Sequence, residues 1–381
     1  MDEVADWGSG GTPKRGVKQF YGGEIPWAVI ADLTDGPVRR TSETITDEGL
    51  NSSSAKLVPP GSVLIAMYGS IGKLGIPEIQ LATNQAIAFA TPHEDRLDRQ
   101  YLFHYLLSER SALLAAGVGG TQPNISQTKL KAWKIPLPPL PEQRRIAAIL
   151  DHAATLRAKR REARARLDEL TQSIFIDMFG NPATNPKGLP VGPLGDLLDS
   201  AQYGTSEKSG ATGEYPVLRM NNITYQGQMD LTDLKFMDLP DDKVDRFTVA
   251  AGDILFNRTN SAELVGKTAV YRGSEKLAYA GYLVRLRATS GNSPEYISAF
   301  LNSAYGKTVL RGMCKSIVGM ANINAHEVQS IQMMQPPSKL QEQFADRVNA
   351  IEDQKSVQRV ALAELDALFA SLQSRAFRGE L

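Results

Sequence analysis

Polar, glycine-rich segments in both halves of the chain carry side chains that suit DNA contact. Arg, Asn, Thr and Ser side chains hydrogen-bond to base edges, and Lys and Arg neutralise phosphates. The candidates in the second half are Tyr203, Lys208, Arg219, Asn221, Asn222, Arg258, Thr259, Asn260, Ser261 and Lys267. The candidates in the first half are Lys14, Arg15, Tyr68, Ser70 and Lys73. Ordinary turn chemistry is the alternative, because Asn, Gly and Ser favour turns in any protein.

The sequence lacks the common motifs of enzymes. It contains no GxGxxG, no P-loop, no HExxH and no GxSxG, and "GNPATNP" (180–186) is not the Asn-Pro-Pro-aromatic run of amino-methyltransferases. The histidines have no metal-ligand spacing, and a single cysteine, Cys314, excludes an internal disulfide and the usual cysteine-rich zinc sites. We therefore expect a binding protein without catalytic residues, metal or cofactor of its own.

Length and composition favour a multi-domain globular protein. The chain has 381 residues, of which 42% are hydrophobic and 22% charged. No apolar run approaches the roughly 18 residues that span a membrane, and no secretory signal is present, so we expect a cytoplasmic protein. Its 42 basic and 42 acidic residues give zero net charge. This charge balance argues against a protein that binds DNA without sequence specificity. It allows a sequence-specific DNA-binding protein whose partner supplies positive charge.

The chain contains one unit twice. A shift of 198 residues places Pro138 on Pro336, Gln143 on Gln341 and Phe179 on Phe377, without a gap. Upstream, "YLFHYLLS" (101–108) resembles "YISAFLNS" (296–303) more loosely. Each copy is thus a variable globular part followed by a better-matched helical part.

The helical parts have apolar residues at alternating steps of three and four, typical of a coiled-coil seam. Pro141 suits a first helical turn and Gly180 can take the left-handed cap, so we predict a helix from about 142 to 178, roughly 55 Å long. The expected seam residues are Ile146, Ile149, Leu156, Arg160, Leu167 and Leu170 in the first copy and Gln358, Leu365 and Leu368 in the second.

We expect the two long helices to pack antiparallel, with Ile146 near Leu372 and Arg160 near Gln358. The polar pair would fix the register at some cost in stability; alternatively, both side chains face solvent. The basic run "RAKRREARAR" (157–166) is either a solvated helix face or a docking surface for a partner or for DNA phosphates.

The globular parts have a mixed pattern. "SVLIAM" (62–67) and "DILFNR" (253–258) predict short buried strands after turns, and "YLFHYLLSERSALLAA" and "YISAFLNSAYGKTVL" predict amphipathic helices. The predicted fold class is α+β, with two mixed α/β domains related by a pseudo-two-fold axis and separated by two long antiparallel coiled-coil helices.

Several of these segments resemble those of the specificity subunits of type I restriction–modification enzymes. They are "MYGSIGKLGI" (67–76), "NISQTKLKAWKIPLPPLPEQRRIAAIL" (124–150), "FIDMFGNP" (175–182), "FNRTNSAELVGKTAV" (256–270) and "LQSRAFRGEL" (372–381). The resemblance implies target-recognition domains at residues 1–140 and 182–340, and helical spacers at residues 141–181 and 341–381.

The resemblance also implies a function and partners. Each recognition domain would read one half of a split target in double-stranded DNA, and the helices would act as a ruler. The helices would also dock two methyltransferase subunits, which bring S-adenosylmethionine and methylate adenine at N6. Two restriction-translocation subunits can join to cleave unmethylated DNA. The chain itself would supply no catalytic residue and no cofactor.

Charge and length refine these expectations. Residues 1–140 carry 13 basic and 14 acidic residues, net −1, and residues 181–340 carry 16 and 15, net +1. Because phosphate neutralisation drives most affinity for duplex DNA, we expect weak binding by the isolated chain and tight binding with methyltransferase subunits. A helix of about 55 Å limits the half-site separation to about 16 base pairs, and about one DNA turn is expected.

Two other function classes remain open. The rival is a structural adaptor that carries two protein-binding domains on a coiled coil and has no DNA role. A carbohydrate-binding repeat rests on the polar loops alone.

Overall fold

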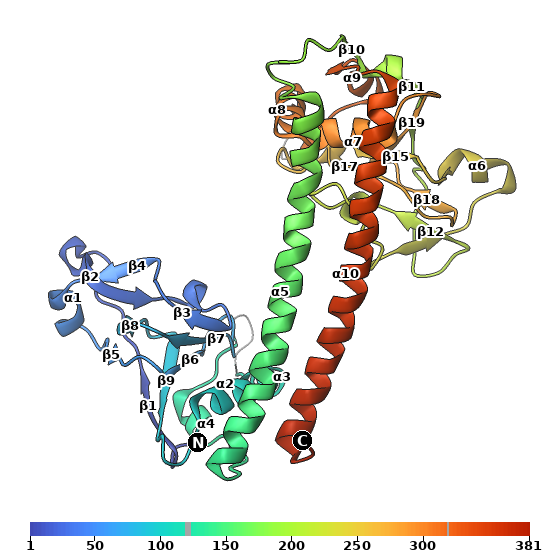
Figure 1. The fold of residues 1–381 in the computed structure, drawn as a ribbon. Helices are drawn as coiled ribbons and strands as arrows, with labels where there is room; N and C mark the ends of the chain where they lie inside the picture. The colour runs from blue at the N-terminus through green and yellow to red at the C-terminus, as the bar shows by residue number, and fades with distance from the viewer. Residues whose placement is uncertain (119–122, 318–319) are drawn as a thin grey trace. The chain divides into compact units, whose positions relative to one another are not determined.

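The structure, a computed structural model, describes residues 1–118, 123–317 and 320–381 (Figure 1). The chain forms two compact units. Unit 1 consists of residues 1–160 together with residues 361–381, and unit 2 consists of residues 161–360. Unit 1 therefore closes on the last stretch of the sequence, and unit 2 begins within the first long helix.

Unit 1 is built on a larger and a smaller sheet. The larger sheet has the order β1 (Ala5–Ser9), β9 (Ile87–Pro92), β6 (Val63–Ala66), β7 (Leu74–Pro77) and β3 (Gly36–Val38), with β3 and β7 parallel. The smaller sheet has the order β4 (Glu43–Ile45), β2 (Tyr21–Ala28), β8 (Leu81–Thr83) and β5 (Leu57–Val58), with β2 and β8 parallel. The helices are η1 (Lys18–Phe20), η2 (Ile30–Asp32), α1 (Asp47–Asn51), α2 (Arg99–Ser108), α3 (Arg110–Ala115) and α4 (Gln127–Lys131).

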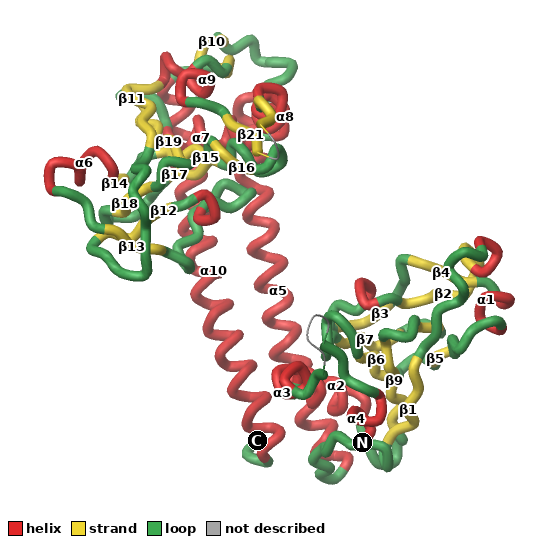
Figure 2. The backbone as a smooth tube through the Cα atoms, turned by 180° about the vertical axis from the view of Figure 1, so that it is seen from behind, coloured by secondary structure: helices red, strands yellow, loops and turns green. Residues whose placement is uncertain are grey.

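Unit 2 repeats this plan and adds to it, as Figure 2 shows from behind. Its larger sheet has the order β11 (Leu198–Tyr203), β19 (Leu283–Ala288), β15 (Ile254–Asn257) and β17 (Thr268–Val270). Its second sheet has the order β13 (Lys235–Met237), β12 (Tyr215–Leu218), β18 (Leu277–Tyr279) and β14 (Thr248–Val249). The additions are the sheet of β16 (Thr259–Asn260), β21 (Met320–Asn322) and β20 (Lys315–Ile317), and the pair of β10 (Val191–Pro193) and β22 (Gln332–Met334). The helices are η3 (Leu194–Leu197), η4 (Met220–Asn222), η5 (Asp241–Lys243), α6 (Val244–Phe247), α7 (Pro294–Asn302), α8 (Ala304–Met313) and α9 (Ala325–Gln329).

The central strand of each larger sheet is buried on both faces, which explains its continuous apolar sequence. Alternate residues of a strand face opposite sides. In β6, Leu64 and Ala66 belong to the core shared with the smaller sheet, whereas Val63 and Ile65 belong to the core shared with α2 and the first long helix. Strand β15 divides its side chains between two cores in the same way. The strands predicted at residues 62–67 and 253–258 are thus confirmed.

The long helices are α5 (Leu140–Phe179) and α10 (Ser338–Arg378). Helix α5 matches the prediction of about 142–178, and Gly180 follows it with φ +84°. In unit 1, Arg157 donates to Asp366 (2.5 Å) and Arg145 donates to the carbonyl of Leu381 (2.7 Å). The two helices therefore run antiparallel in this unit. The fold class of mixed α/β domains with two long helices is confirmed.

The helices also run antiparallel in unit 2. Lys355 of α10 forms an ion pair with Asp168 of α5 (3.1 Å). Nearer the end of α5, the ring of Phe179 contacts the ring of Phe344, near the start of α10 (5.3 Å between centroids). Each long helix thus starts in the core of one unit and ends in the core of the other.

The predicted heptad seam is only partly buried. Ile146 is buried, and Leu372 packs against the same core, as the antiparallel pairing requires. In contrast, Leu156 is 39% exposed, Leu170 41% and Leu368 51%. Ile149, Leu167 and Leu365 are half-buried. Arg160 is exposed and ends the first segment of unit 1, and Gln358 belongs to unit 2, so their pairing stays a prediction.

The buried face of α5 keeps heptad steps but in a different phase from the predicted seam. Its buried residues in unit 1 include Ile146, Leu150 and Ala153, and Arg157 of the following turn bonds to α10. These steps of four, three and four residues pass through Leu150 and Arg157, where the predicted seam has Ile149 and Leu156. The helix packs on its own globular domain as well as on α10, and this second contact selects the face.

Candidate nucleic-acid interface

In each unit a loop beside the central strand meets a segment that lies far away in the sequence. In unit 1, Tyr68, just beyond β6, forms a bridge with Asn124. In unit 2, Thr259, just beyond β15, pairs with Asn322 across β16 and β21. The two asparagines are also matched by the 198-residue shift in the sequence. The fold thus brings the candidate residues that follow each central strand to equivalent places.

The unit 1 candidates differ in how free their side chains are. Lys14 and Ser70 are exposed, and Tyr68 is 44% exposed. Arg15 bonds to Glu43 (2.5 Å), and its guanidinium lies 4.9 Å from the ring of Trp27. Lys73 is half-buried and donates to the carbonyl of Ile30 (3.3 Å). Lys14, Arg15, Tyr68 and Ser70 are therefore all exposed, and of these Arg15 is already bonded to a carboxylate.

In unit 2, Arg258 lies at the junction of several segments. Its guanidinium donates to Asn322 Oδ1 (3.2 Å) and to the carbonyl of Gly281 (3.4 Å), and it lies over the ring of Tyr203 (4.8 Å). The Tyr203 hydroxyl in turn accepts a hydrogen bond from the backbone N–H of Ala325 (2.8 Å). Arg258 therefore connects the segments that carry Tyr203, Gly281 and Asn322. Its side chain lies against the ring of Tyr203, which is partly exposed to solvent.

Three unit 2 candidates are buried and serve the fold. Asn222 accepts from the Arg219 N–H (2.8 Å) and donates to two loop carbonyls, which shapes η4. Lys267 donates to the carbonyls of Met220 and Ile223, and burial lowers its pKa. Thr259 is also buried. Side chains enclosed in this way have little surface to offer to DNA.

The remaining unit 2 candidates stay accessible. Lys208, Asn221 and Ser261 are exposed, and Asn260 is half-buried. Arg219 is half-buried and forms an ion pair with Asp233 (2.9 Å).

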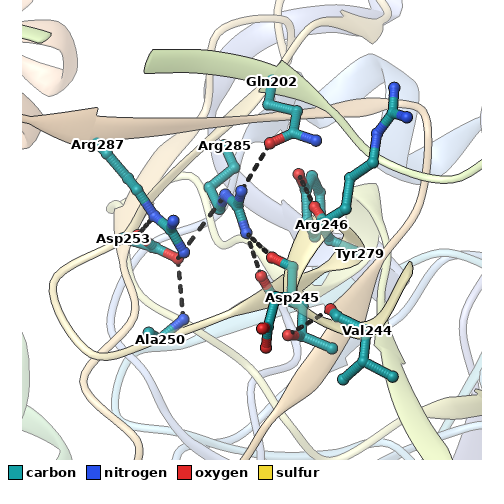
Figure 3. A network of polar contacts seen from close by, with 10 residues as sticks. Gln202, Val244, Asp245, Arg246, Ala250, Asp253, Tyr279, Arg285 and Arg287 are labelled. Carbon is teal, nitrogen blue, oxygen red and sulfur yellow. Dashed lines mark hydrogen bonds and ion pairs between the residues drawn. The ribbon is translucent and has the colours of Figure 1, made fainter. Parts of the chain in front are cut away.

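A charged network braces unit 2 from within (Figure 3). Arg285 is buried, and it donates to Gln202 Oε1 (2.7 Å) and to the carbonyls of Asp245 and Thr248. Asp253 receives two hydrogen bonds from Arg287, at 2.7 and 3.2 Å. Burial lowers the pKa of Arg285, whereas the bond to Asp253 raises the pKa of Arg287. The network fixes β14 and α6 against the larger sheet.

Unit 1 fills the same places with neutral groups. Phe89 pairs with Gly8 across β9 and β1, as Arg285 pairs with Gln202 across β19 and β11. A Cβ atom at Gly8 would meet the Phe89 ring at 2.2 Å, so glycine is needed there. Ser62 bonds to Thr91 (2.9 Å), where unit 2 has Asp253 and Arg287. The two units therefore share much of their topology but differ in the side chains of their interiors.

Sequence reasoning missed a pair of positioning residues in the proline-rich junctions. Buried Gln143 accepts from the N–H of Asp98 (2.9 Å), the N-cap of α2. Buried Gln341 accepts from the N–H of Ser293 (2.9 Å), the N-cap of α7. Their exact match in the internal repeat was the available signal. Tyr282, half exposed beside Arg258, was also missed, and its place in the short loop between β18 and β19 gave no signal.

Across the described parts of the chain, no cluster of His, Cys, Asp and Glu side chains could hold a metal ion. No helix among the described residues is long and apolar enough to cross a membrane.

Comparison with known proteins gives this geometry a context. Residues 1–163 match the family model of the type I restriction modification DNA specificity domain. The chain is 27% identical to the EcoKI specificity subunit of Escherichia coli K12, over 94% of this chain and 82% of that protein. It is 34% identical to the EcoR124I/EcoR124II specificity subunit of Escherichia coli, over 46% of this chain and 45% of that protein.

Solved structures agree at the level of fold. The S subunit of a type I restriction–modification system from M. genitalium matches 99% of this chain and 94% of its own, with a TM-score of 0.57 and 15% identity. A chain solved in work on complex assembly of the type I R-M system matches 100% of this chain and 97% of its own, with a TM-score of 0.57 and 20% identity. The chain therefore carries a type I restriction modification DNA specificity domain and is a relative of the specificity subunits of type I restriction enzymes.

Proposed function

We propose that this chain is the DNA-recognition subunit of a type I restriction–modification complex, with each globular domain reading one half of a bipartite target. The observation that carries the proposal is the specificity-domain match over residues 1–163 together with the recurrence of the same topology in unit 2. A duplicated reader suits a target with two halves. The accessible candidates are Lys14, Arg15, Tyr68 and Ser70 in unit 1 and Tyr203, Lys208, Asn221 and Ser261 in unit 2.

The partners follow from the same proposal. Two methyltransferase subunits dock on the helices, bring S-adenosylmethionine and methylate adenine at N6, and two restriction-translocation subunits can join them. Leu156, Leu170 and Leu368 support a docked partner, because each leaves an apolar side chain on an outer helix face. This chain supplies no catalytic group and no cofactor in the scheme.

Methylome sequencing with and without the gene tests the proposal. We expect a split motif with methylated adenine in both halves that disappears when the gene is deleted. Purification of the tagged full chain should also recover an adenine methyltransferase and bound DNA. An unchanged methylome, with other proteins recovered in place of a methyltransferase, would favour the adaptor with two protein-binding domains.

A further inference from the structure

Lys307 of α8 is a buried ammonium group. The residue is 9% exposed, and its Nζ is fully covered and has no hydrogen-bond partner among the described residues. Burial, with the nearby charges of Lys267 and Arg311, lowers the pKa of Lys307 to about 8. The Nζ lies 5.1 Å from the centroid of the Tyr225 ring.

Unit 1 offers a contrast, because a cation in the corresponding helix region has a counter-charge. Asp35 is the third residue after η2, and Tyr225 is the third residue after η4. Arg110 of α3, the helix that follows α2, donates two hydrogen bonds to Asp35, at 3.0 and 2.5 Å. Helix α8 likewise follows α7, but Lys307 is its fourth residue whereas Arg110 is the first residue of α3, so the two cations are not equivalent. Arg110 has a carboxylate partner, whereas Lys307 lies beside an aromatic ring.

The surroundings of Lys307 are positively charged. The Lys267 ammonium is satisfied by two backbone carbonyls, which carry no full charge. Arg311 is exposed on the next turn of α8. No carboxylate of the described residues contributes to the pKa of Lys307. A buried ion is unfavourable without a counter-charge, and a cation–π contact offsets only part of that cost.

We propose that Lys307 and Arg311 form a phosphate-binding site that takes a phosphodiester group of the DNA backbone when the Tyr225 ring turns aside. Tyr225 is 45% exposed, so its ring can leave Lys307 without disturbing the core. The inference rests on the proposed function and deepens it, since such a contact positions the duplex without reading a base. Arg110 of unit 1, by contrast, is already paired with Asp35.

The salt dependence of DNA binding tests this site. The full chain is titrated with a short duplex of mixed sequence at several KCl concentrations. Lys307→Met keeps the length of the side chain and removes the charge, so the slope of log K against log[KCl] should fall in magnitude by about 0.9, the value of one phosphate contact. Tyr225→Asp places a carboxylate beside Lys307, and it should cause the same loss. Lys339→Met, at an exposed lysine of α10, is the control and should leave the slope unchanged.

The outcomes distinguish failure of the phosphate site from failure of the proposed function. Lys307→Met removes an unfavourable buried charge, so weaker DNA binding by this variant cannot come from unfolding. Wild-type slopes in both the Lys307→Met and Tyr225→Asp variants would overturn the phosphate site and leave the proposed function standing. A wild-type chain that binds no DNA, even at the lowest salt and with its methyltransferase, would overturn both.

Discussion

Two buried glutamines explain why the chain repeats its proline-to-helix junction. Gln143 closes a ring of hydrogen bonds with the Asp98 N–H and with the carbonyls of Arg96 and Pro138. Gln341 makes the matching bonds to the Ser293 N–H and the Pro336 carbonyl. Each side chain thereby ties the start of a long helix to the N-terminus of a helix in its own globular domain.

Removal of Gln143 should loosen α2. Gln143→Ala leaves buried backbone groups without partners, at a cost of about 1–3 kcal/mol for each. We expect faster amide hydrogen exchange in α2 and unchanged exchange in α7, with the reverse for Gln341→Ala. Gln354→Ala, at an exposed glutamine of α10, is the control and should change the free energy of opening by no more than about 0.5 kcal/mol. Equal effects on α2 and α7 from either variant would contradict the local role.

Lys307 should make the stability of unit 2 depend on pH. Its pKa is about 8 in the folded chain and 10.5 in a free lysine, so between these values the unfolded chain binds more protons. The free energy of unfolding therefore rises with pH across this window. Lys307→Met removes the penalty, and at pH 7 the variant should be more stable by about 3 kcal/mol, a gain that shrinks toward pH 10. Denaturation of both proteins across this range measures it; a gain that does not vary with pH would refute the assignment.

Residue types in the sequence identified the segments with binding chemistry but not which side chains stay free. Asn222 and Lys267 look like base and phosphate contacts in the sequence, yet both are buried: Asn222 donates to the carbonyl of Asp230 and Lys267 to the carbonyl of Met220. This burial depends on contacts between the region of η4 and residues more than 40 positions later in the chain. The hydrogen bond from Lys267 to the carbonyl of Ile223 is one of them. Such a long-range contact leaves no periodic pattern in the sequence.

Among the elements, the long helices were the most predictable and their contact face the least. Pro141 and Gly180 predicted the bounds of α5 within two residues. The heptad pattern selected Leu156, but the helix turns that side chain outward and directs Arg157 to Asp366 and to the ring of Phe369 (4.2 Å). Periodicity assumes a single partner surface, whereas α5 packs on both α10 and α2.

The end of α10 should be required for unit 1 and dispensable for unit 2. Phe369 and Ala376 belong to the unit 1 core, and the ring of Phe377 contacts Tyr101 and Tyr105 (5.3 Å to each). A chain that ends at residue 360 would expose this apolar surface. We expect limited proteolysis to cut within residues 1–140 while residues 182–340 stay protected. A peptide of residues 361–381, added in trans, should restore protection, and a scrambled peptide of the same composition should not.

At the scale of the whole molecule, the compact units do not coincide with the two copies of the sequence repeat. The sequence repeats as two consecutive copies, but each compact unit takes helix from both copies. Neither copy can therefore complete its own core. For the proposed function, near-zero charge in both globular parts, net −1 and +1, means that affinity for DNA would come from a few local sites and from partners.

The helices should set the distance between the two half-sites of the target. Residues 158–164 of α5 and 357–363 of α10 lie where the chain passes between unit 1 and unit 2, outside the Arg157–Asp366 and Lys355–Asp168 pairs. Deleting both heptads shortens each helix by about 10 Å and changes its rotational phase by only about 20°, so the cores of both units are kept. The spacer of the methylated motif should become shorter by about three base pairs, with both half-sites unchanged. Replacing the same residues with Glu, Ala and Lys at constant length is the matched control and should keep the original spacer. Methylome sequencing reads both variants: an altered half-site, or an unchanged spacer after the deletion, would refute the ruler.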